Sequence, residues 1–198
     1  MDLKLTYNKI AEDWHKNHQQ DDWWVEGADK FVSFLKTDNI VLDVGCGGGT
    51  KTKYLIDKGL NVIGIDFSEK MIEIAKREVP KAEFRVLDLW DIENLKENFD
   101  GIFIQAVLLH FPKKEIKDIL NKTVKKLKIG GYLYIAVKKI KEGQPEEEIK
   151  IENDYGYQYK RFFSYFTPDE LRNLLLDLKM KIVYKNVAGC WIQIISRK

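Results

Sequence analysis

Short β-branched segments alternate with longer amphipathic segments through the middle of the chain. The short segments are rich in Val, Ile and Leu, which is typical of strands buried in an α/β protein. They are residues 40–44, 61–65, 82–87, 101–104 and 132–137. Because helical segments separate them, the pattern predicts parallel strands joined by helices, and therefore an α/β fold.

The segments between these strands carry apolar residues at helical spacing. They cover residues 50–58, 68–79 and 112–127. We expect Ser68 to cap the second helix, because its side-chain oxygen can accept a hydrogen bond from a free backbone amide. Gly130-Gly131 follows the third helix, and we expect it to end that helix as a glycine C-cap does.

The C-terminal part of the chain predicts one more helix and an antiparallel hairpin. Thr167-Pro168-Asp169-Glu170 places Thr, Pro and Glu where a capping box needs them, so a helix is expected through Leu178. Residues 181–186 and 191–196 then form two short strands that are expected to pair at the edge of the sheet.

Residues 138–166 break the alternating pattern. They are polar, charged and rich in aromatic residues, and they are too long for an ordinary connection between two elements. We interpret them as an insertion that covers a substrate. The alternative is a hairpin whose aromatic side chains fill the edge of the sheet.

The composition fits one globular domain. Of 198 residues, 44% are hydrophobic and 32% are charged, and 33 Lys and Arg against 31 Asp and Glu give a net charge of +2. Such a balance produces no global field that demands nucleic acid or an anionic membrane. No apolar run approaches the roughly 20 residues of a spanning helix, and no signal-peptide core opens the chain, so we expect a cytoplasmic protein. Cys46 and Cys190 lack metal-ligand spacing, which argues against a disulfide scaffold or a metal site and leaves their pairing open.

Residues 41–50 are the most informative segment, because a strand runs directly into a glycine loop and then into a helix. Glycines let the backbone turn sharply and approach a ligand, and the free amides of the helix start attract a negative group. The segment therefore predicts a nucleotide-like ligand. Dinucleotide folds share Gly45-x-Gly47, but their third glycine falls where this chain has Thr50, so NAD is the weaker interpretation.

An acidic residue accompanies each of three successive predicted strands. Asp43 lies inside the first strand, where a carboxylate needs a cation or several donors, and an ammonium group on the ligand would supply them. Asp66 ends the second strand, the position from which an acid accepts both hydroxyl hydrogens of a ribose. Asp88, at the end of the third strand, could accept from an adenine amino group or only cap a turn, while Phe67 and Met71 could cover the ring.

Residues 43–49 resemble the first motif of the class I S-adenosylmethionine-dependent methyltransferases, an acid followed by Gly-x-Gly-x-Gly. The resemblance continues at Asp66, Asp88, Gln105 and Gly130-Gly131. It implies a Rossmann-like three-layer sandwich with a mostly parallel seven-stranded sheet and an antiparallel C-terminal hairpin strand. It also implies S-adenosylmethionine as the cofactor and S-adenosylhomocysteine as its product.

Two further segments resemble the same broad group. Tyr7-Asn8-Lys9-Ile10-Ala11 is similar to the Tyr-Asp-x-x-Ala opening of the small-molecule members, with Asn8 in place of the acid, and residues 161–175 resemble a recurring tail. We therefore expect one methyltransferase domain over residues 1–198. Its parts are an N-terminal helical lid (1–37), a cofactor-binding core (38–137), the substrate-covering insertion (138–166) and a C-terminal helix and hairpin (167–198).

The resemblance also implies which residues contact each part of the cofactor. Those at the methionine part are Gly45, Cys46, Gly47, Gln105 and Ala106. Those at the adenosine part are Asp66 for the ribose and Asp88 and Leu89 for adenine, and Tyr7 and Trp14 would close over the cofactor.

His110 lies at the carboxyl edge of a predicted parallel strand, where open α/β sheets bind substrates. It could act as a general base, with Tyr7 as a second candidate catalytic residue, or it could only cap or pack against the helix that follows. The candidate contacts to the acceptor are His110, Lys138, Arg161 and Phe163. An anionic or aromatic acceptor would suit them.

These observations predict in-line transfer of the sulfonium methyl group to a small-molecule acceptor. A compact chain with a lid and a long insertion would leave a closed pocket. An RNA such as tRNA, or a protein, is the alternative acceptor, and a non-catalytic cofactor-binding protein is a third hypothesis. The lysine-rich face of residues 112–127 has no interleaved aromatic residues, so it is expected to be a solvated surface rather than a nucleic-acid site. The oligomeric state stays open.

Overall fold

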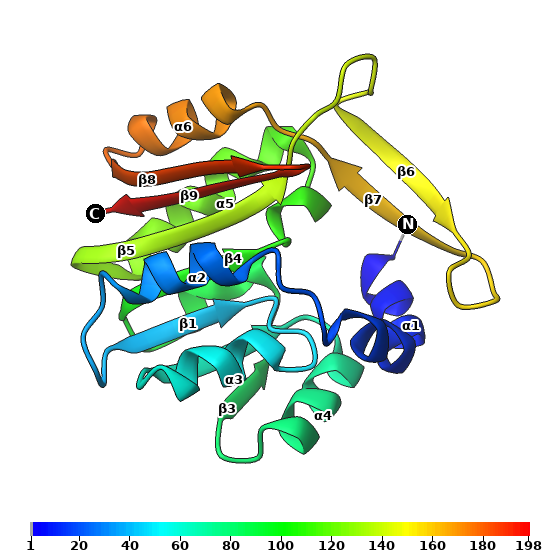
Figure 1. The fold of residues 1–198 in the computed structure, drawn as a ribbon, viewed down its shortest axis with the longest axis horizontal. Helices are drawn as coiled ribbons and strands as arrows, with labels where there is room; N and C mark the ends of the chain where they lie inside the picture. The colour runs from blue at the N-terminus through cyan, green and yellow to red at the C-terminus, as the bar shows by residue number, and fades with distance from the viewer. Residues whose placement is uncertain (1) are drawn as a thin grey trace.

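The computed structural model describes residues 2–198, which form an α/β/α sandwich with a small additional sheet (Figure 1). The strands are β1 (Ile40–Val44), β2 (Asn61–Asp66), β3 (Glu83–Val86), β4 (Phe99–Gln105), β5 (Leu127–Lys138), β6 (Glu147–Glu152), β7 (Tyr159–Ser164), β8 (Lys181–Ala188) and β9 (Trp191–Arg197). The helices are α1 (Leu3–His18), α2 (Val25–Val32), α3 (Thr50–Asp57), α4 (Glu69–Glu78), α5 (Lys113–Lys126) and α6 (Pro168–Asp177), with short 3-10 helices η1 (Leu89–Asn94) and η2 (Leu108–His110).

The main sheet has seven strands in the order β3-β2-β1-β4-β5-β9-β8. Its first five strands are parallel, whereas β9 runs antiparallel to β5 and β8 antiparallel to β9. This arrangement confirms the mostly parallel sheet and the C-terminal hairpin at its edge. Because β1 to β5 are parallel, their carboxyl ends meet at one side of the molecule, where ligands bind in open α/β sheets.

Helices cover both faces of this sheet, as alternating strand side chains require. Leu42 and its neighbours on one face pack against α5 and α6, while Val41 and its neighbours on the other face pack against α2 and α3. Figure 1 shows α2 and α3 on one side of the sheet and α5 on the opposite side. Phe31 of α2 lies against Phe103 and Tyr134 of the sheet, at ring-centroid distances of 5.5 and 6.1 Å.

The predicted helix caps are present at two of three positions. The Ser68 side chain accepts a hydrogen bond from the Met71 amide at 3.1 Å, and Thr167 and Glu170 form the capping box at the start of α6. The prediction for Gly130-Gly131 was wrong. α5 already ends at Lys126, and both glycines lie inside β5.

The reason for this glycine pair is an irregularity in the strand ladder. Phe99 pairs with Leu127 and Gly101 with Tyr132, so β5 carries extra residues between two ladder contacts. Gly130 has a φ of 81°, and a Cβ on Gly131 would lie 2.8 Å from the Asp100 carbonyl oxygen. The glycines therefore serve a bulge in a long strand rather than the end of a helix.

Residues 147–164 form the separate two-stranded sheet, in which β6 pairs antiparallel with β7. Figure 1 shows this hairpin and α1 at the same end of the molecule, beyond the carboxyl ends of β1, β4 and β5. α1 contacts both α4 and β7. The hairpin therefore stands over the edge of the main sheet where a ligand is expected.

Cys46 is buried and Cys190 is exposed, and neither forms a disulfide. Within residues 2–198 no helix combines the length and the apolar character that crossing a membrane requires.

Candidate active site

A cavity of about 390 Å³ lies at the carboxyl ends of β1, β2, β4 and β5. Such a volume lies within the range of small-molecule sites. Every residue predicted for the site lines it: Tyr7, Trp14, Asp43, Gly45, Cys46, Gly47, Asp66, Phe67, Met71, Asp88, Leu89, Gln105, Ala106, His110, Lys138, Arg161 and Phe163. The structure therefore brings the predicted residues together, while their roles stay predictions.

The glycine loop after β1 turns through backbone conformations that favour glycine. Gly45, Gly47 and Gly49 have φ values of 65°, 53° and 87°. A Cβ on Gly45 would also lie 2.3 Å from a methyl group of Val107. The loop can thus fold tightly against the end of β4 and leave its backbone beside the cavity.

Asp66 is 6% exposed and both of its carboxylate oxygens are engaged. One oxygen accepts a hydrogen bond from the Gly47 amide at 3.0 Å and the other from the Ser68 amide at 2.9 Å. Burial, which these two bonds only partly offset, raises the pKa of the carboxyl to about 6. The carboxylate oxygens retain lone pairs that can accept hydrogen bonds from the hydroxyl groups of a ligand.

Asp43 is also buried, at 2% exposed, and the Thr52 hydroxyl of α3 donates to it at 2.6 Å. Burial raises the pKa of this carboxyl to about 7, against the lowering effects of the Thr52 hydrogen bond and of the Lys51 charge. The sequence suggested that an ammonium group of the ligand would donate hydrogen bonds to this carboxylate. In the structure the Thr52 hydroxyl already supplies one of these hydrogen bonds.

Asp88 lies two residues beyond the end of β3 rather than at the strand end that the sequence indicated. Its side chain accepts a hydrogen bond from the Trp90 amide at 2.9 Å and caps η1, while its contact with adenine stays a prediction. Asp88 lines the cavity as well, next to Leu89. Capping one backbone amide leaves the second carboxylate oxygen available to a ligand.

Two polar atoms in the cavity wall lack a hydrogen-bond partner among residues 2–198. They are the Gln105 side-chain oxygen at the end of β4 and the Trp14 indole nitrogen of α1, and both are buried. Buried polar groups are normally paired, so this pair marks places where a polar ligand would bond. Ala106 follows Gln105 with a φ of 57°, an uncommon conformation for a residue with a side chain. These features fit a ligand with both donors and acceptors, as the amino-acid part of S-adenosylmethionine has.

Asn8, which replaces an acid in the family pattern, docks α1 onto the start of α4. Its side-chain oxygen accepts from the Ser68 hydroxyl at 2.6 Å and from the Lys70 amide at 3.2 Å, and its amide donates to Glu69 at 2.9 Å. An aspartate could not make the last bond. The asparagine is therefore suited to the carboxylate that faces it.

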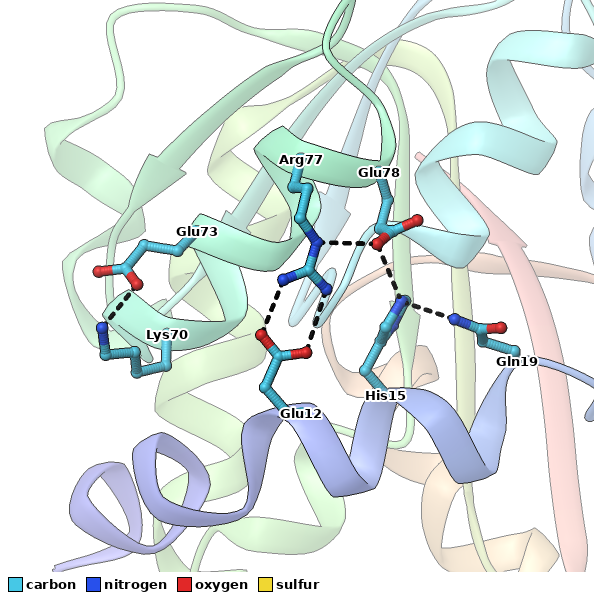
Figure 2. A network of polar contacts seen from close by, with 7 residues as sticks. All are labelled: Glu12, His15, Gln19, Lys70, Glu73, Arg77 and Glu78. Atoms are coloured by element: carbon cyan, nitrogen blue, oxygen red, sulfur yellow. Dashed lines mark hydrogen bonds and ion pairs between the residues drawn. The ribbon is translucent and has the colours of Figure 1, made fainter.

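Further along α1, a polar network continues this contact with α4 (Figure 2). Arg77 forms a bidentate ion pair with Glu12, at 2.8 and 3.0 Å, and its Nε donates to Glu78 at 3.0 Å. Gln19 donates to His15 Nε2 at 2.9 Å, and the same nitrogen lies 3.9 Å from Glu78. The Arg77–Glu12 and His15–Glu78 pairs join α1 to α4, and α1 carries Tyr7 and Trp14 at the cavity.

Within the N-terminal part, residues of α1 and of the turn after it, up to Trp23, line the cavity. α2 instead packs against the sheet. The lid hypothesis for residues 1–37 therefore concerns α1 and the turn that follows it.

His110 is fixed on both ring nitrogens. Its Nδ1–H donates to the Phe162 carbonyl at 2.8 Å, so the neutral ring leaves Nε2 to accept from the Tyr7 hydroxyl at 2.7 Å. Arg161 donates to the same hydroxyl at 3.3 Å and forms a bidentate pair with Glu152 at 2.6 Å for each bond. Burial, with the nearby Arg161 charge, lowers the pKa of His110 to about 3. The imidazole is therefore neutral and a weak proton acceptor.

Two charged residues that the sequence did not single out also line the cavity. Lys51, near the start of α3, and Asp21, after α1, both belong to its wall. Burial lowers the pKa of Lys51, while the charges of Asp43 and Asp21 raise it. The position of Lys51, directly after the glycine loop, was the available signal for it.

Two tryptophans were also missed. Trp23 and Trp191 stack face to face, with 3.8 Å between ring centroids, and both line the cavity. The Gln193 amide donates to the Trp23 carbonyl at 3.3 Å and so holds this turn against β9. No local sequence pattern reveals the pair, because the two residues meet only in the folded chain.

The fold is Rossmann-like, and the cavity lies at the edge of the sheet where ligands bind in such folds. Residues 41–131 match the family model described as a methyltransferase domain. This segment holds the glycine loop, Asp66, Asp88 and Gln105, the residues that carry the resemblance to the class I S-adenosylmethionine-dependent methyltransferases.

Curated proteins that are similar to this chain include methyltransferases. The chain is 30% identical, over 133 residues, to the ubiquinone biosynthesis O-methyltransferase of Pelagibacter ubique, covering 66% of this chain and 53% of that protein. It spans about half the length of the curated relatives it matches.

Solved structures share the fold over nearly the whole chain. DhpI in complex with SAH superposes with a TM-score of 0.79 at 19% identity, covering 98% of this chain and 94% of that one. The 1,6-didemethyltoxoflavin-N1-methyltransferase of Burkholderia thailandensis, with bound 1,6-didemethyltoxoflavin and S-adenosylhomocysteine, superposes with a TM-score of 0.76 at 18% identity, covering 99% of this chain and 87% of that one. At this level of identity the likeness shows the fold alone.

Proposed function

We propose that the protein transfers the methyl group of S-adenosylmethionine to a small-molecule acceptor by in-line displacement. The order of residues along the sheet edge is the observation that carries this proposal. Asp66 ends β2, the glycine loop follows β1, Gln105 ends β4 and Lys138 ends β5, and all of them line one cavity. An elongated donor and an acceptor can lie end to end along such a row.

At the cofactor end, the proposed roles follow the chemistry of each group. Asp66 would accept the ribose hydroxyls, and Asp88 and Leu89 would contact adenine. Gln105 would accept from the ammonium group, which would satisfy its unpartnered oxygen. Asp43 would lie near the same end of the ligand rather than at the sulfur. This matters because the sulfonium charge disappears during transfer, and a nearby anion would favour the ground state.

Three glycine-loop residues and four neighbouring side chains complete the proposed cofactor contacts. They are Gly45, Cys46 and Gly47 with Ala106 at the methionine part, Phe67 and Met71 over adenine, and Trp14 above the cofactor. Tyr7 and Trp14 would exclude water, so that the protein acts chiefly by holding two reactants in contact. Such placement supplies about 7 to 11 kcal/mol in favourable cases.

We propose that His110 orients Tyr7 rather than serving as the proton acceptor. Its Nε2 already receives the Tyr7 hydroxyl, and its lowered pKa makes protonation unfavourable at neutral pH. The Tyr7 oxygen, fixed from two sides by His110 and Arg161, would then contact the acceptor. A methyl transfer to an acceptor that is already nucleophilic needs no stronger base.

The lysine-rich face of α5 supports a small acceptor over a nucleic acid. Its lysines are largely engaged within the protein, as in the pairs Lys113–Glu170, Lys117–Asp177 and Lys125–Glu93. Phosphate binding would have to compete with these contacts. Cytoplasmic location and the absence of a nucleic-acid partner stay predictions.

Calorimetric titration with S-adenosylmethionine and S-adenosylhomocysteine tests the cofactor proposal. We expect Asp66→Ala to weaken binding by about 100-fold, because charge-assisted hydrogen bonds to two hydroxyls are lost. Asp57→Ala, at an exposed position of α3, is the matched control and should bind normally. Undiminished affinity in Asp66→Ala would remove Asp66 from the site. Turnover of radiolabelled cofactor with a metabolite extract then separates an enzyme from a non-catalytic binding protein.

A further inference from the structure

Lys138 is a charged group in the cavity wall that no acidic residue neutralises within the described chain. It makes no ion pair within 4.0 Å, and its ammonium lies 4.9 Å from the ring centroid of Phe163 and 5.9 Å from that of Trp191. Burial lowers its pKa, as do the charges of Arg161 and Lys150, while the charge of Glu152 acts in the opposite direction. A partly buried cation without a counter-charge is costly unless a ligand supplies one.

The other charges near Lys138 are already paired. Arg161 is neutralised by Glu152 through two hydrogen bonds of 2.6 Å. Lys150, which also lies over the Phe163 ring at 5.6 Å, is paired with Glu148 at 3.5 Å. This part of the cavity therefore carries one uncompensated positive charge, on Lys138.

The position of Lys138 separates it from the proposed cofactor contacts. It ends β5, whereas the proposed cofactor residues, apart from Tyr7 and Trp14 of α1, lie on or after β1, β2, β3 and β4. The strand order places Lys138 three strands from Asp66, or roughly 14 Å at the usual strand spacing. The cofactor end has its own lysine, Lys51, near Asp43. Lys138 is thus placed to meet the acceptor.

The walls around this charge are flat and aromatic. Trp23 and Trp191 stack with 6° between their planes, and Phe163 and Tyr7 contribute further rings. Aromatic side chains present large, rigid surfaces on which a planar ligand can stack. An uncompensated cation beside such walls suits a ligand that combines a ring with an anion.

We propose that the acceptor is a small aromatic carboxylate, whose carboxylate pairs with the Lys138 ammonium while its ring packs against Trp191 and Phe163. This inference rests on the proposed function, since it names the acceptor class for the same cavity. Lys138 then selects the acceptor by charge, and the aromatic walls select it by shape.

The test compares carboxylates with their neutral amides on the full chain saturated with S-adenosylhomocysteine. Benzoate, 2-naphthoate and indole-3-acetate are titrated against benzamide, 2-naphthamide and indole-3-acetamide by calorimetry. We expect at least one carboxylate to bind about tenfold or more tighter than its amide, because a charge-assisted hydrogen bond is added. If every carboxylate binds no better than its amide, or none binds, the inference is overturned.

Variants locate the preference. Lys138→Met should remove the advantage of the carboxylate, and Lys138→Arg should retain most of it. Lys150→Met is the matched control, because it removes a second ammonium over the same Phe163 ring without lining the cavity. A preference that survives in Lys138→Met, or that disappears in Lys150→Met, contradicts the assignment. If Lys138→Met does not fold, the ligand pairs on the unaltered protein still decide.

The same titrations keep the two proposals distinguishable. A protein that fails to bind S-adenosylhomocysteine overturns the proposed function. A protein that binds it normally, yet treats carboxylates and amides alike, overturns only the inference about the acceptor.

Discussion

The two ends of the cavity differ in where their residues come from and in how their charges are satisfied. At the cofactor end, Asp43 and Asp66 lie on adjacent parallel strands and bond to groups of the chain itself. At the acceptor end, Tyr7, Lys138 and Arg161 come from a helix, a strand and a hairpin that are distant in the sequence. The geometry of the cofactor end is therefore set by strand pairing in the main sheet. The geometry of the acceptor end depends on how α1 and the β6–β7 hairpin pack against that sheet.

Under the proposed function, this difference lets the fold keep the same methyl donor while its acceptor changes. The glycine loop and Asp66 are fixed by strand pairing and backbone hydrogen bonds, so they tolerate little change. The hairpin of β6 and β7 is a separate sheet and can vary without disturbing β1 or β2. Acceptor specificity can then vary in peripheral segments, such as this hairpin, that the rigid sheet holds in place.

The largest effect is expected at the acceptor end, from removing the partner of Arg161. Glu152→Gln leaves a mostly buried guanidinium without its counter-charge. We expect the free energy of unfolding to fall by about 2 to 3 kcal/mol, less than for a fully buried pair because some solvent reaches it. Urea unfolding measures this loss. Glu148→Gln, whose partner Lys150 is more exposed, should lose much less, and equal losses would show that the hairpin does not depend on the Arg161 pair.

A second substitution tests how α1 docks over the cofactor end. A Cβ on Gly48 would lie 2.1 Å from His15 Nδ1, and Gln19 holds that ring from the other side. Gly48→Ala should therefore displace α1, with a loss of about 1 to 3 kcal/mol, as for other overpacked sites, and weaker S-adenosylhomocysteine binding.

The double variant supplies the control for this substitution. In a His15→Ala background the added methyl group has room, so Gly48→Ala should have little further effect on stability. If the two losses simply add, Gly48 and His15 act independently, and the glycine serves another purpose.

A third experiment uses the pKa of Asp66, which is raised to about 6. Only the carboxylate accepts hydrogen bonds from both ribose hydroxyls, so protonation of Asp66 should weaken S-adenosylhomocysteine binding by up to about tenfold per pH unit below pH 6, in addition to any change near pH 7 from Asp43. Calorimetry from pH 5 to 8 measures the curve. Asp66→Asn should bind weakly with a flatter profile, in which the change near pH 7 from Asp43 remains. An unchanged profile would contradict the role of Asp66.

The smallest effect is expected at Ala106, whose φ of 57° is unfavourable for a residue with a Cβ. In Ala106→Gly, relief of strain offsets the greater freedom of glycine in the unfolded chain, so stability should stay within about 0.5 kcal/mol of the unaltered protein. Ala136→Gly, in the buried strand β5, has no strain to relieve and should lose about 1 kcal/mol. Thermal unfolding of both variants compares them, and a large loss in Ala106→Gly would mean that the packing of its methyl group against the Leu109 and Phe163 cluster outweighs the relief of strain.

The sequence predicted what local patterns determine. The parallel strands, the caps at Ser68 and Thr167 and the glycine loop each follow from a few adjacent residues. The glycine pair in β5 was misassigned because a helix end and a strand bulge both favour glycine. The stack of Trp23 on Trp191 could not be predicted, since it depends on the docking of the α1–α2 turn against β9.

Tyr7 belongs to the helix that lies over the glycine loop, yet its hydroxyl bonds to His110 and Arg161 at the opposite end of the cavity. Any opening of α1 that lets the donor leave must also break these two bonds and dismantle the place where the acceptor sits. In a protein that works as proposed, the two small molecules would therefore exchange in a fixed order. The donor would be the first to enter and its spent form the last to depart.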